Sequence, residues 1–180
     1  MPDASARAGR RAMGVDLAAY IRDIPDFPKP GIVFKDITPL LRDPRAFAAA
    51  IEALAAPYVE EPPDLIVAPE ARGFIFAGPL AQKLRCGFVP LRKPGKLPAD
   101  TVSQEYELEY GKAAIEVHRD AIGNGDRVLV LDDLLAIGGT AAAAIALVER
   151  LGGRVIGVAF LIEQRNRLRG HPVHSVLHVS

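Results

Sequence analysis

The stretch VLVLDDLLAIGGT at residues 128–140 decides the fold that this sequence predicts. It opens with an apolar run that ends in a carboxylate, as in a strand buried on both faces of a parallel sheet. Paired glycines follow the carboxylates Asp132 and Asp133, and the next residues, TAAAAIALVERL, favour a helix. The stretch therefore predicts a strand, a glycine-containing loop and a helix, with both carboxylates at the C-terminal end of the strand.

This strand, loop and helix would bring three kinds of chemistry to one edge of the sheet. In open α/β sheets, ligands bind beyond the carboxyl ends of the strands. The free N–H groups and positive dipole end at a helix N-terminus suit a phosphate, and glycines let the backbone approach it. The carboxylates could hold sugar hydroxyls, a hard metal ion, or both. Together they predict a site for a phosphorylated ribose, with a structural bend that binds nothing as the alternative.

Composition and motifs exclude several other classes of protein. The chain has no GxxxxGK[ST] motif, and no GxGxxG opens a helix. A formal net charge of +0 argues against a dedicated nucleic-acid binder, and 180 residues suggest one globular core. No apolar run approaches the roughly eighteen residues of a membrane span. The single cysteine, Cys86, cannot form an internal disulfide, so we expect a cytoplasmic protein.

Segments on both sides of residues 128–140 carry a family resemblance. They are PDFPKPGIVFKDITPLLRDP at 25–44, EARGF at 70–74, VPLRKPGKLP at 89–98 and ELEYGKAAIEVHRDAI at 107–122. In order and spacing they resemble the adenine phosphoribosyltransferase family. The central stretch is similar to the motif for 5-phosphoribosyl 1-diphosphate (PRPP) of type I phosphoribosyltransferases, in which DD precedes a TGGT loop. The resemblance runs from about residue 17 to about residue 163.

The resemblance implies the type I phosphoribosyltransferase fold. That is an α/β fold: a parallel sheet flanked by helices, with an antiparallel hairpin lid and a small N-terminal hood. The alternating strand and helix patterns agree, and EYELEYG and AAIEVH predict the hairpin. We expect a disordered tail at 1–14 and a single domain at 15–180, with the hood or arm at 15–42 and a mobile lid at 93–110.

The sequence marks the boundaries of two expected helices less clearly than those of the other elements. Asp16 is a possible N-cap for a helix over LAAYIRDI. Pro79 is expected to interrupt or delay the helix in GFIFAGPLAQKLR, because proline cannot donate a backbone hydrogen bond.

The resemblance also implies an activity. It is transfer of the 5-phosphoribosyl group from PRPP to adenine, giving AMP and diphosphate, with Mg²⁺ carried by PRPP and no direct protein ligands. Family members are usually homodimers, so a homodimer is expected. Two alternatives remain open: a phosphoribosyltransferase for another base, such as xanthine or orotate, and a noncatalytic PRPP- or nucleotide-binding homologue. The hood segment argues against the first, and the lack of room for an added DNA-binding domain argues against the second.

The expected site residues fall into four groups. Catalytic roles are implied for Arg72, Glu109, Asp132 and Asp133. The 5′-phosphate is expected on Ala136, Ile137, Gly138, Gly139 and Thr140. The diphosphate is expected on Glu70, Ala71, Arg72, Arg92, Lys93 and Lys96. The base is expected on Val33, Phe34 and Lys35.

The chemistry of these side chains fits the implied roles. Asp132 and Asp133 would hold the ribose hydroxyls and favour cationic character at C1′. Arg72 can offer a bidentate fork to a diphosphate, with an ion pair to Glu70 as the structural alternative. Glu109 would manage the proton on the purine, as the resemblance implies, whereas Glu107 is expected to be an exposed strand residue.

The chain departs from the family's pattern at two of these positions. Ile137 replaces the usual threonine of ATGGT, so one hydroxyl donor to the 5′-phosphate is lost. Lys35 stands where many members have arginine, which keeps a charge and an aliphatic stem but loses the planar fork. His171, His174 and His178 lack a zinc-site spacing, so no metal is expected there.

Overall fold

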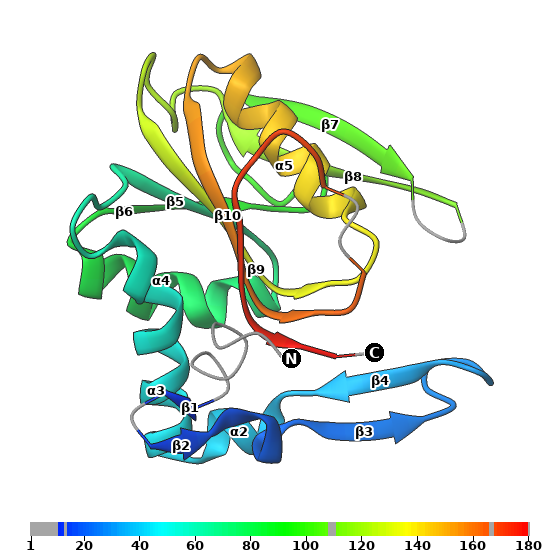
Figure 1. Cartoon of the computed structure of the whole chain (residues 1–180). Coiled ribbons are helices and arrows are strands. Elements are labelled where there is room, and N and C mark those ends of the chain that lie inside the picture. Colours follow the sequence, from blue (N-terminus) through cyan, green and yellow to red (C-terminus); the bar gives the residue numbers. More distant parts are fainter. Residues whose placement is uncertain (1–10, 13, 108–110, 166–167, 180) are drawn as a thin grey trace. The chain divides into compact units, whose positions relative to one another are not determined.

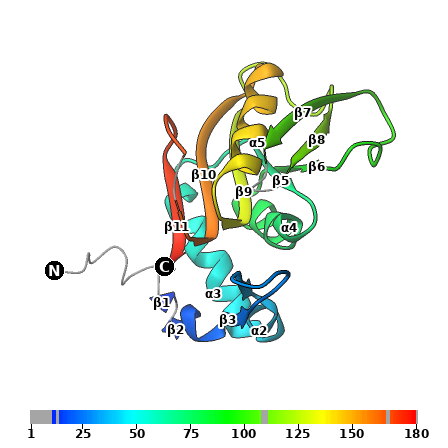
Figure 2. The same cartoon turned by 90° about the vertical axis from the view of Figure 1, so that its right-hand side faces the viewer.

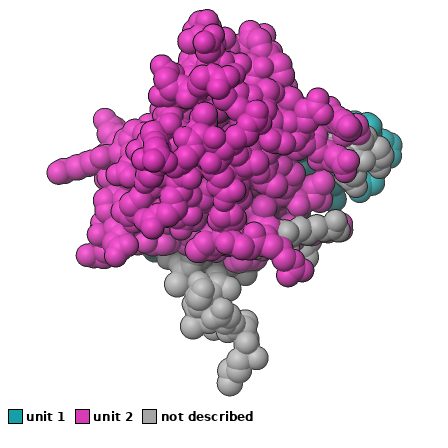
Figure 3. Space-filling model, turned by 90° about the horizontal axis from the view of Figure 1, so that it is seen from above, with its two compact units in different colours: residues 1–53 teal, residues 54–180 magenta. Residues whose placement is uncertain are grey.

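A computed structural model describes residues 11–12, 14–107, 111–165 and 168–179 of the chain (Figures 1 and 2). The chain divides into two compact units, residues 1–53 and 54–180, coloured separately in Figure 3. The single domain at 15–180 therefore stays a prediction.

The N-terminal unit begins with the short antiparallel pair β1 (Arg11–Ala12) and β2 (Val15–Asp16), so strand pairing starts inside the predicted tail. The 3-10 helix η1 (Leu17–Tyr20) follows. The antiparallel hairpin of β3 (Arg22–Pro25) and β4 (Val33–Asp36) comes next. The helix expected over LAAYIRDI was therefore wrong beyond η1, and Asp16 makes no side-chain cap hydrogen bond. Proline disfavours the α conformation in the residue before it, and Pro25 closes β3.

Two helices complete the first part of the chain, α2 (Thr38–Arg42) and α3 (Pro44–Ala55). Asp43 caps α3 as expected, because its Oδ1 accepts hydrogen bonds from the N–H groups of Arg45 and Ala46, both at 2.9 Å. Proline at the first helical position has no N–H that would need a partner there. The 3-10 helix η2 (Ala56–Tyr58) follows α3.

The C-terminal unit is built on a five-stranded sheet with the order β11-β10-β9-β5-β6 (Figure 1). All neighbouring strands in this sheet are parallel, which confirms the predicted sheet. The strands are β5 (Leu65–Pro69), β6 (Gly87–Leu91), β9 (Arg127–Leu135), β10 (Arg154–Glu163) and β11 (Val173–His178).

The two faces of this sheet are covered by different elements. Helix α5 (Gly139–Arg150) and the antiparallel hairpin of β7 (Thr101–Glu107) and β8 (Lys112–His118) share one buried cluster with Val128 and Val130 of β9. Leu129 and Leu131 alternate to the other face, as strand geometry requires. Helix α4 (Arg72–Leu84) packs there, and its buried residues are absent from the α5 cluster. The predicted helices on both faces are confirmed.

Helix α4 continues through Pro79, so the expected interruption was wrong. A proline inside a helix costs about 3 kcal/mol. Burial of a large apolar side chain contributes about 1.5–3 kcal/mol, and α4 fully buries both Phe76 and Leu80. Packing of this face therefore outweighs the lost hydrogen bond. No helix in the described part of the chain is long and apolar enough to cross a bilayer.

Strand β7 begins at Thr101, earlier than the stretch EYELEYG at 105–111 that predicted the first strand of the hairpin. The base of the hairpin belongs to the core, because Val102 and Val117 are buried against α5. In addition, Arg150 of α5 donates from Nη1 to the carbonyl oxygen of Ser103 at 3.0 Å. The base of the predicted lid is thus held by α5, and lid mobility stays a prediction.

Candidate active site

The paired carboxylates lie in β9 beyond the point where its pairing with β5 ends. Its pairing with β10 continues past them. It pairs with β10 as far as Leu135, so the strand end expected at Asp132 was placed too early. Its pairing with β5 stops at Val130. Asp132 and Asp133 therefore lie in a strand that is hydrogen-bonded on one side and open on the other. The open side is where β5 turns away into α4.

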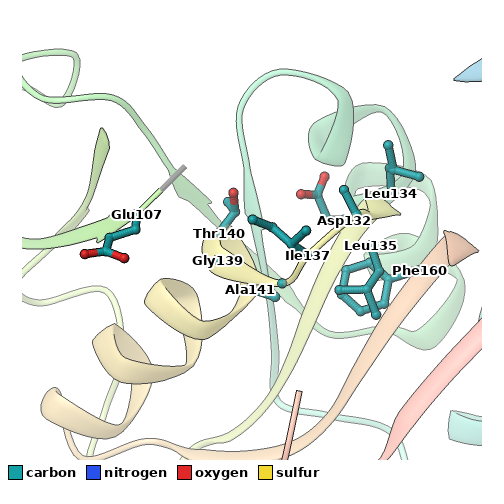
Figure 4. Close-up of a pocket in the computed structure, with 11 residues that line it drawn as sticks. Glu107, Asp132, Leu134, Leu135, Ile137, Gly139, Thr140, Ala141 and Phe160 are labelled. Carbon is teal, nitrogen blue, oxygen red and sulfur yellow. The ribbon is translucent and has the colours of Figure 1, made fainter. Parts of the chain in front are cut away.

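Two adjacent pockets occupy this region of the C-terminal unit. The first measures about 230 Å³ and follows the loop between β9 and α5 (Figure 4). The second measures about 200 Å³ and lies between the β5–α4 loop, the hairpin and β9. Asp132 and Thr140 line both pockets, so these two residues mark the boundary between them.

All five residues predicted to hold the 5′-phosphate line the first pocket: Ala136, Ile137, Gly138, Gly139 and Thr140. Gly138 has φ +93°, in the left-handed region that favours glycine. A Cβ on Gly139 would lie 2.8 Å from the carbonyl oxygen of Glu107 in β7. The paired glycines are therefore required by a left-handed turn and by close approach of the hairpin, at the N-terminus of α5.

The second pocket contains the predicted diphosphate arginine. Arg72 Nε lies 3.0 Å from Asp133 Oδ2, which places a cation beside the carboxylate pair. The alternative in which Arg72 pairs with Glu70 was wrong, because Arg72 pairs with Asp133. Glu70 instead accepts hydrogen bonds from Arg92 Nη2 at 3.1 Å and from the Lys93 N–H at 2.6 Å. These donors, the Lys93 N–H first, hold the pKa of Glu70 below its ordinary value.

Burial changes the acidity of the carboxylate pair. Asp133 is only 3% exposed, and Asp132 Oδ1 accepts a hydrogen bond from the Asp133 N–H at 2.8 Å. Burial, and next the negative charge of Asp133, raise the pKa of Asp132 well above its ordinary value. Burial also raises the pKa of Asp133, although the guanidinium of Arg72 opposes that rise. The pair therefore holds a proton more readily than ordinary aspartates do.

The remaining predicted residues are placed less directly. Glu70, Ala71 and Lys93 line the second pocket with Arg72, whereas Arg92 and Lys96 line neither of these two pockets. Glu109 lies outside the described residues. Val33, Phe34 and Lys35 belong to the N-terminal unit.

The hairpin that carries the predicted base-binding residues exposes apolar surface. Phe27 is 52% exposed and Val33 is 46% exposed. The rings of Phe27 and Phe34 meet edge to face with their centroids 5.3 Å apart. Lys35 is 9% exposed, and its Nζ lies 2.9 Å and 3.0 Å from the two carboxylate oxygens of Asp23. The charge of Lys35 is thus neutralised within the hairpin.

Sequence reasoning missed several residues that line the pockets: Leu134, Leu135, Ala141 and Phe160 in the first, and Pro69, Tyr106 and Ile115 in the second. The alternation of β7 could have identified Tyr106, because it places Tyr106 on the face opposite to Glu107. Glu107 borders the first pocket, but its carboxylate points away from the loop residues in Figure 4. Its expected role as an exposed strand residue is consistent with this orientation.

The oxygen atoms of Asp132 and Asp133 are of the kind that Mg²⁺ binds in proteins. In the ranges that the structure describes, no group of three or more His, Cys, Asp or Glu side chains could hold a metal ion alone. Mg²⁺ commonly takes one or two carboxylates and completes its shell with phosphates and waters. Asp132 and Asp133 both line the second pocket and fit that pattern.

Comparison with known proteins agrees with this geometry. The model of the phosphoribosyl transferase domain matches residues 40–179. The adenine phosphoribosyltransferase of Methylococcus capsulatus is 58% identical over 167 residues, which cover 90% of this chain and 98% of that protein. The crystal structure of adenine phosphoribosyltransferase from Thermoanaerobacter pseudethanolicus has a TM-score of 0.87 at 54% identity, covering 91% of this chain and 98% of that one. The Saccharomyces cerevisiae enzyme, in a crystal structure that contains adenine, has a TM-score of 0.83 at 39% identity, covering 89% of this chain and 96% of that one.

The sheet, the paired carboxylates and the glycine loop at the start of α5 define a phosphoribosyltransferase domain of type I. The high sequence identities to these relatives narrow the class to one family. This chain belongs to the adenine phosphoribosyltransferase family.

Proposed function

We propose that this protein transfers the 5-phosphoribosyl group of PRPP to adenine, and that the two adjacent pockets hold PRPP during the reaction. The observation that carries the proposal is the position of Asp132 and Asp133, between the glycine loop and Arg72. A phosphate pocket, a carboxylate pair and a cation follow one another, as do the 5′-phosphate, the ribose and the diphosphate of PRPP.

The first pocket would anchor the 5′-phosphate. The glycine loop offers backbone N–H groups at the N-terminus of α5, and Thr140 adds a hydroxyl. The 5′-phosphate does not react, so its binding serves to place C1′. Fixing the reacting atoms in this way can supply several kcal/mol of the barrier reduction.

Asp132 and Asp133 would accept hydrogen bonds from the ribose 2′ and 3′ hydroxyls. The bond from C1′ to the diphosphate oxygen lengthens before the new bond forms, so positive charge develops on the sugar. Nearby carboxylates stabilise that charge more in the transition state than in the ground state, which is the condition for catalysis.

Arg72 and Lys93 would balance charge on the departing diphosphate, because both line the second pocket. Mg²⁺, when bound with PRPP, neutralises further charge on the leaving group. We infer that Asp132 and Asp133 orient the sugar beside this complex rather than holding the metal without substrate.

Adenine N9 would attack C1′ on the side opposite the diphosphate. The N9–C1′ bond then forms at the carbon from which the diphosphate departs with the electrons of the C1′–O bond, and the N9 proton passes to a base, for which Glu109 is the candidate by family resemblance. Val33, Phe34 and Lys35 are the candidate contacts of the purine, and their exposed hairpin offers apolar surface and backbone groups. The products are AMP and diphosphate, and a homodimer is the expected assembly.

The test is diphosphate release from PRPP and Mg²⁺ with adenine, hypoxanthine, guanine or orotate. We expect adenine to be preferred by at least about tenfold in kcat/KM, which corresponds to about 1.4 kcal/mol of transition-state discrimination. Equal or faster turnover of another base would reject adenine as the substrate. A protein that binds AMP in calorimetry without turning over any base would be a noncatalytic homologue.

A further inference from the structure

The segment between β6 and β7 contains a turn with a lysine at each end. It reads Lys93-Pro94-Gly95-Lys96, and the Lys96 N–H donates to the Lys93 carbonyl oxygen at 3.3 Å. Gly95 has φ +77°, close to the value that a type II turn requires at its third residue, and proline is common at the second. The sequence therefore specifies a tight turn rather than an open loop.

Side chains outside the turn fix it at three points. Glu70 Oε1 accepts a hydrogen bond from the Lys93 N–H at 2.6 Å, and Arg92 Nη1 donates to the Lys96 carbonyl oxygen at 3.3 Å. The Gly95 N–H, which points out of the turn, donates to Glu116 Oε2 at 3.1 Å. Each end and the middle of the turn are thus held by a different partner.

Glu116 is the anchor that belongs to the hairpin. Its neighbours in β8, Ile115 and Val117, are 3% and 0% exposed, so alternation turns the Glu116 side chain away from the core and toward the turn. Its backbone exchanges two hydrogen bonds with Arg92, with N–O distances of 2.7 Å and 2.9 Å. Glu116 therefore reaches the turn from a backbone position fixed on two sides.

We propose that Glu116 is a positioning residue for the diphosphate end of PRPP: by accepting from the Gly95 N–H, it holds the turn so that Lys93 faces the leaving group. The proposal rests on the proposed function for the identity of the ligand. Lys93 lines the second pocket with Arg72, so a shift of the turn moves a cation at the site. A preorganised turn also loses less conformational freedom when the anion binds.

Three variants separate this role from a general effect of charge. Glu116→Ala removes the acceptor and the charge, Glu116→Gln keeps an acceptor oxygen without the charge, and Glu105→Ala removes an exposed carboxylate from β7. If Glu116 merely repelled an anionic substrate, losing its charge would tighten PRPP. If it positions the turn, only loss of the acceptor will weaken PRPP.

For Glu116→Ala we expect the KM for PRPP to rise by about three- to tenfold, with kcat and the KM for adenine within about twofold of wild type. Glu116→Gln and Glu105→Ala should stay within about twofold of wild type in all three constants. Partial unfolding lowers the apparent kcat but not the KM, so a structural defect would give a different pattern. An unchanged KM in Glu116→Ala, or equal impairment in Glu116→Gln, overturns the proposal.

Calorimetry with magnesium diphosphate separates this proposal from the proposed function. If wild type turns over no base, adenine transfer fails, but weaker diphosphate binding by Glu116→Ala than by wild type still supports the positioning role. Equal binding by the two proteins overturns it. A wild type that neither turns over nor binds magnesium diphosphate overturns both proposals.

Discussion

Near the end of β9 the carboxylate of Asp133 is buried and paired with Arg72, whereas the β3–β4 hairpin leaves two large apolar side chains in solvent. Asp133 is 3% exposed and lies beside Arg72, but Phe27 is 52% exposed. Electrostatic interactions strengthen where water is excluded, while apolar contact contributes only in proportion to the area it buries. Substitutions near the end of β9 should therefore change catalysis by orders of magnitude, and those on the hairpin by small factors.

The largest effect is expected from the carboxylates. Asp132→Asn or Asp133→Asn should lower kcat by about a hundredfold or more, with a smaller change in KM, because the lost charge acts mainly in the transition state. Steady-state kinetics with PRPP and adenine measures both constants. Asp120→Asn, at an exposed position, is the control and should match wild type. Wild-type kcat in both site variants would remove the pair from the reaction.

The second-largest effect on kinetics is expected at the glycine loop, residues 136–140. Ile137 is 38% exposed and lines the first pocket, where a threonine could donate to the 5′-phosphate. Ile137→Thr should lower the KM for PRPP by about tenfold or more, since a hydrogen bond to a charged group contributes about 1.5–3 kcal/mol. Ile137→Val, which is also β-branched but has no hydroxyl, should leave the KM unchanged. If the threonine variant binds PRPP no better, the side chain at 137 does not reach the phosphate.

The buried charge should also cost stability. The pKa of Asp132 is raised in the folded protein. The stability that protonated Asp132 contributes is therefore fully present below the ordinary aspartate pKa of 3.8, and it is lost as pH rises through the pKa of the folded state. Asp132→Asn should therefore raise the free energy of unfolding at pH 7.5 by about 1 kcal/mol, with little change near pH 4. Thermal melts across this range measure the difference. A gain that is as large at pH 4 as at pH 7.5 would exclude the charge as its cause.

The smallest effect is expected on the hairpin. Phe27→Ala should raise the KM for adenine by about threefold and leave that for PRPP unchanged, because it removes part of an apolar contact surface. Val59→Ala, which trims a similarly exposed side chain in the C-terminal unit, is the control. Equal increases in both KM values would show that the hairpin does more than contact the base.

The glycine loop at residues 136–140 and the strand before it could be predicted from sequence because they are local. The apolar run, Asp132, Asp133 and the paired glycines are contiguous, and strand, loop and helix follow from neighbouring residues. The same pattern placed the strand end too early, because pairing with β10 is decided by a segment far along the chain.

The ion pairs of the second pocket could not be predicted, because they depend on the order of the strands. Pro69 and Leu91 are partners across β5 and β6, so Glu70 and Arg92 emerge side by side. From the sequence alone, Arg72 is the nearer alternative partner of Glu70, whereas in the structure Glu70 pairs with Arg92 and Arg72 pairs with Asp133. The start of β7 was missed for a related reason, since its first residue is set by pairing of Thr101 with His118.

The raised pKa values of Asp132 and Asp133 link the binding of PRPP to the protonation of this carboxylate pair. Ribose hydroxyls and Mg²⁺ would favour the ionised carboxylates, so we expect any proton that the pair holds to leave when PRPP binds. The released proton is taken up by the buffer. The heat of PRPP binding should therefore vary with the ionisation enthalpy of the buffer, and the slope of that dependence counts the protons that the pair gives up.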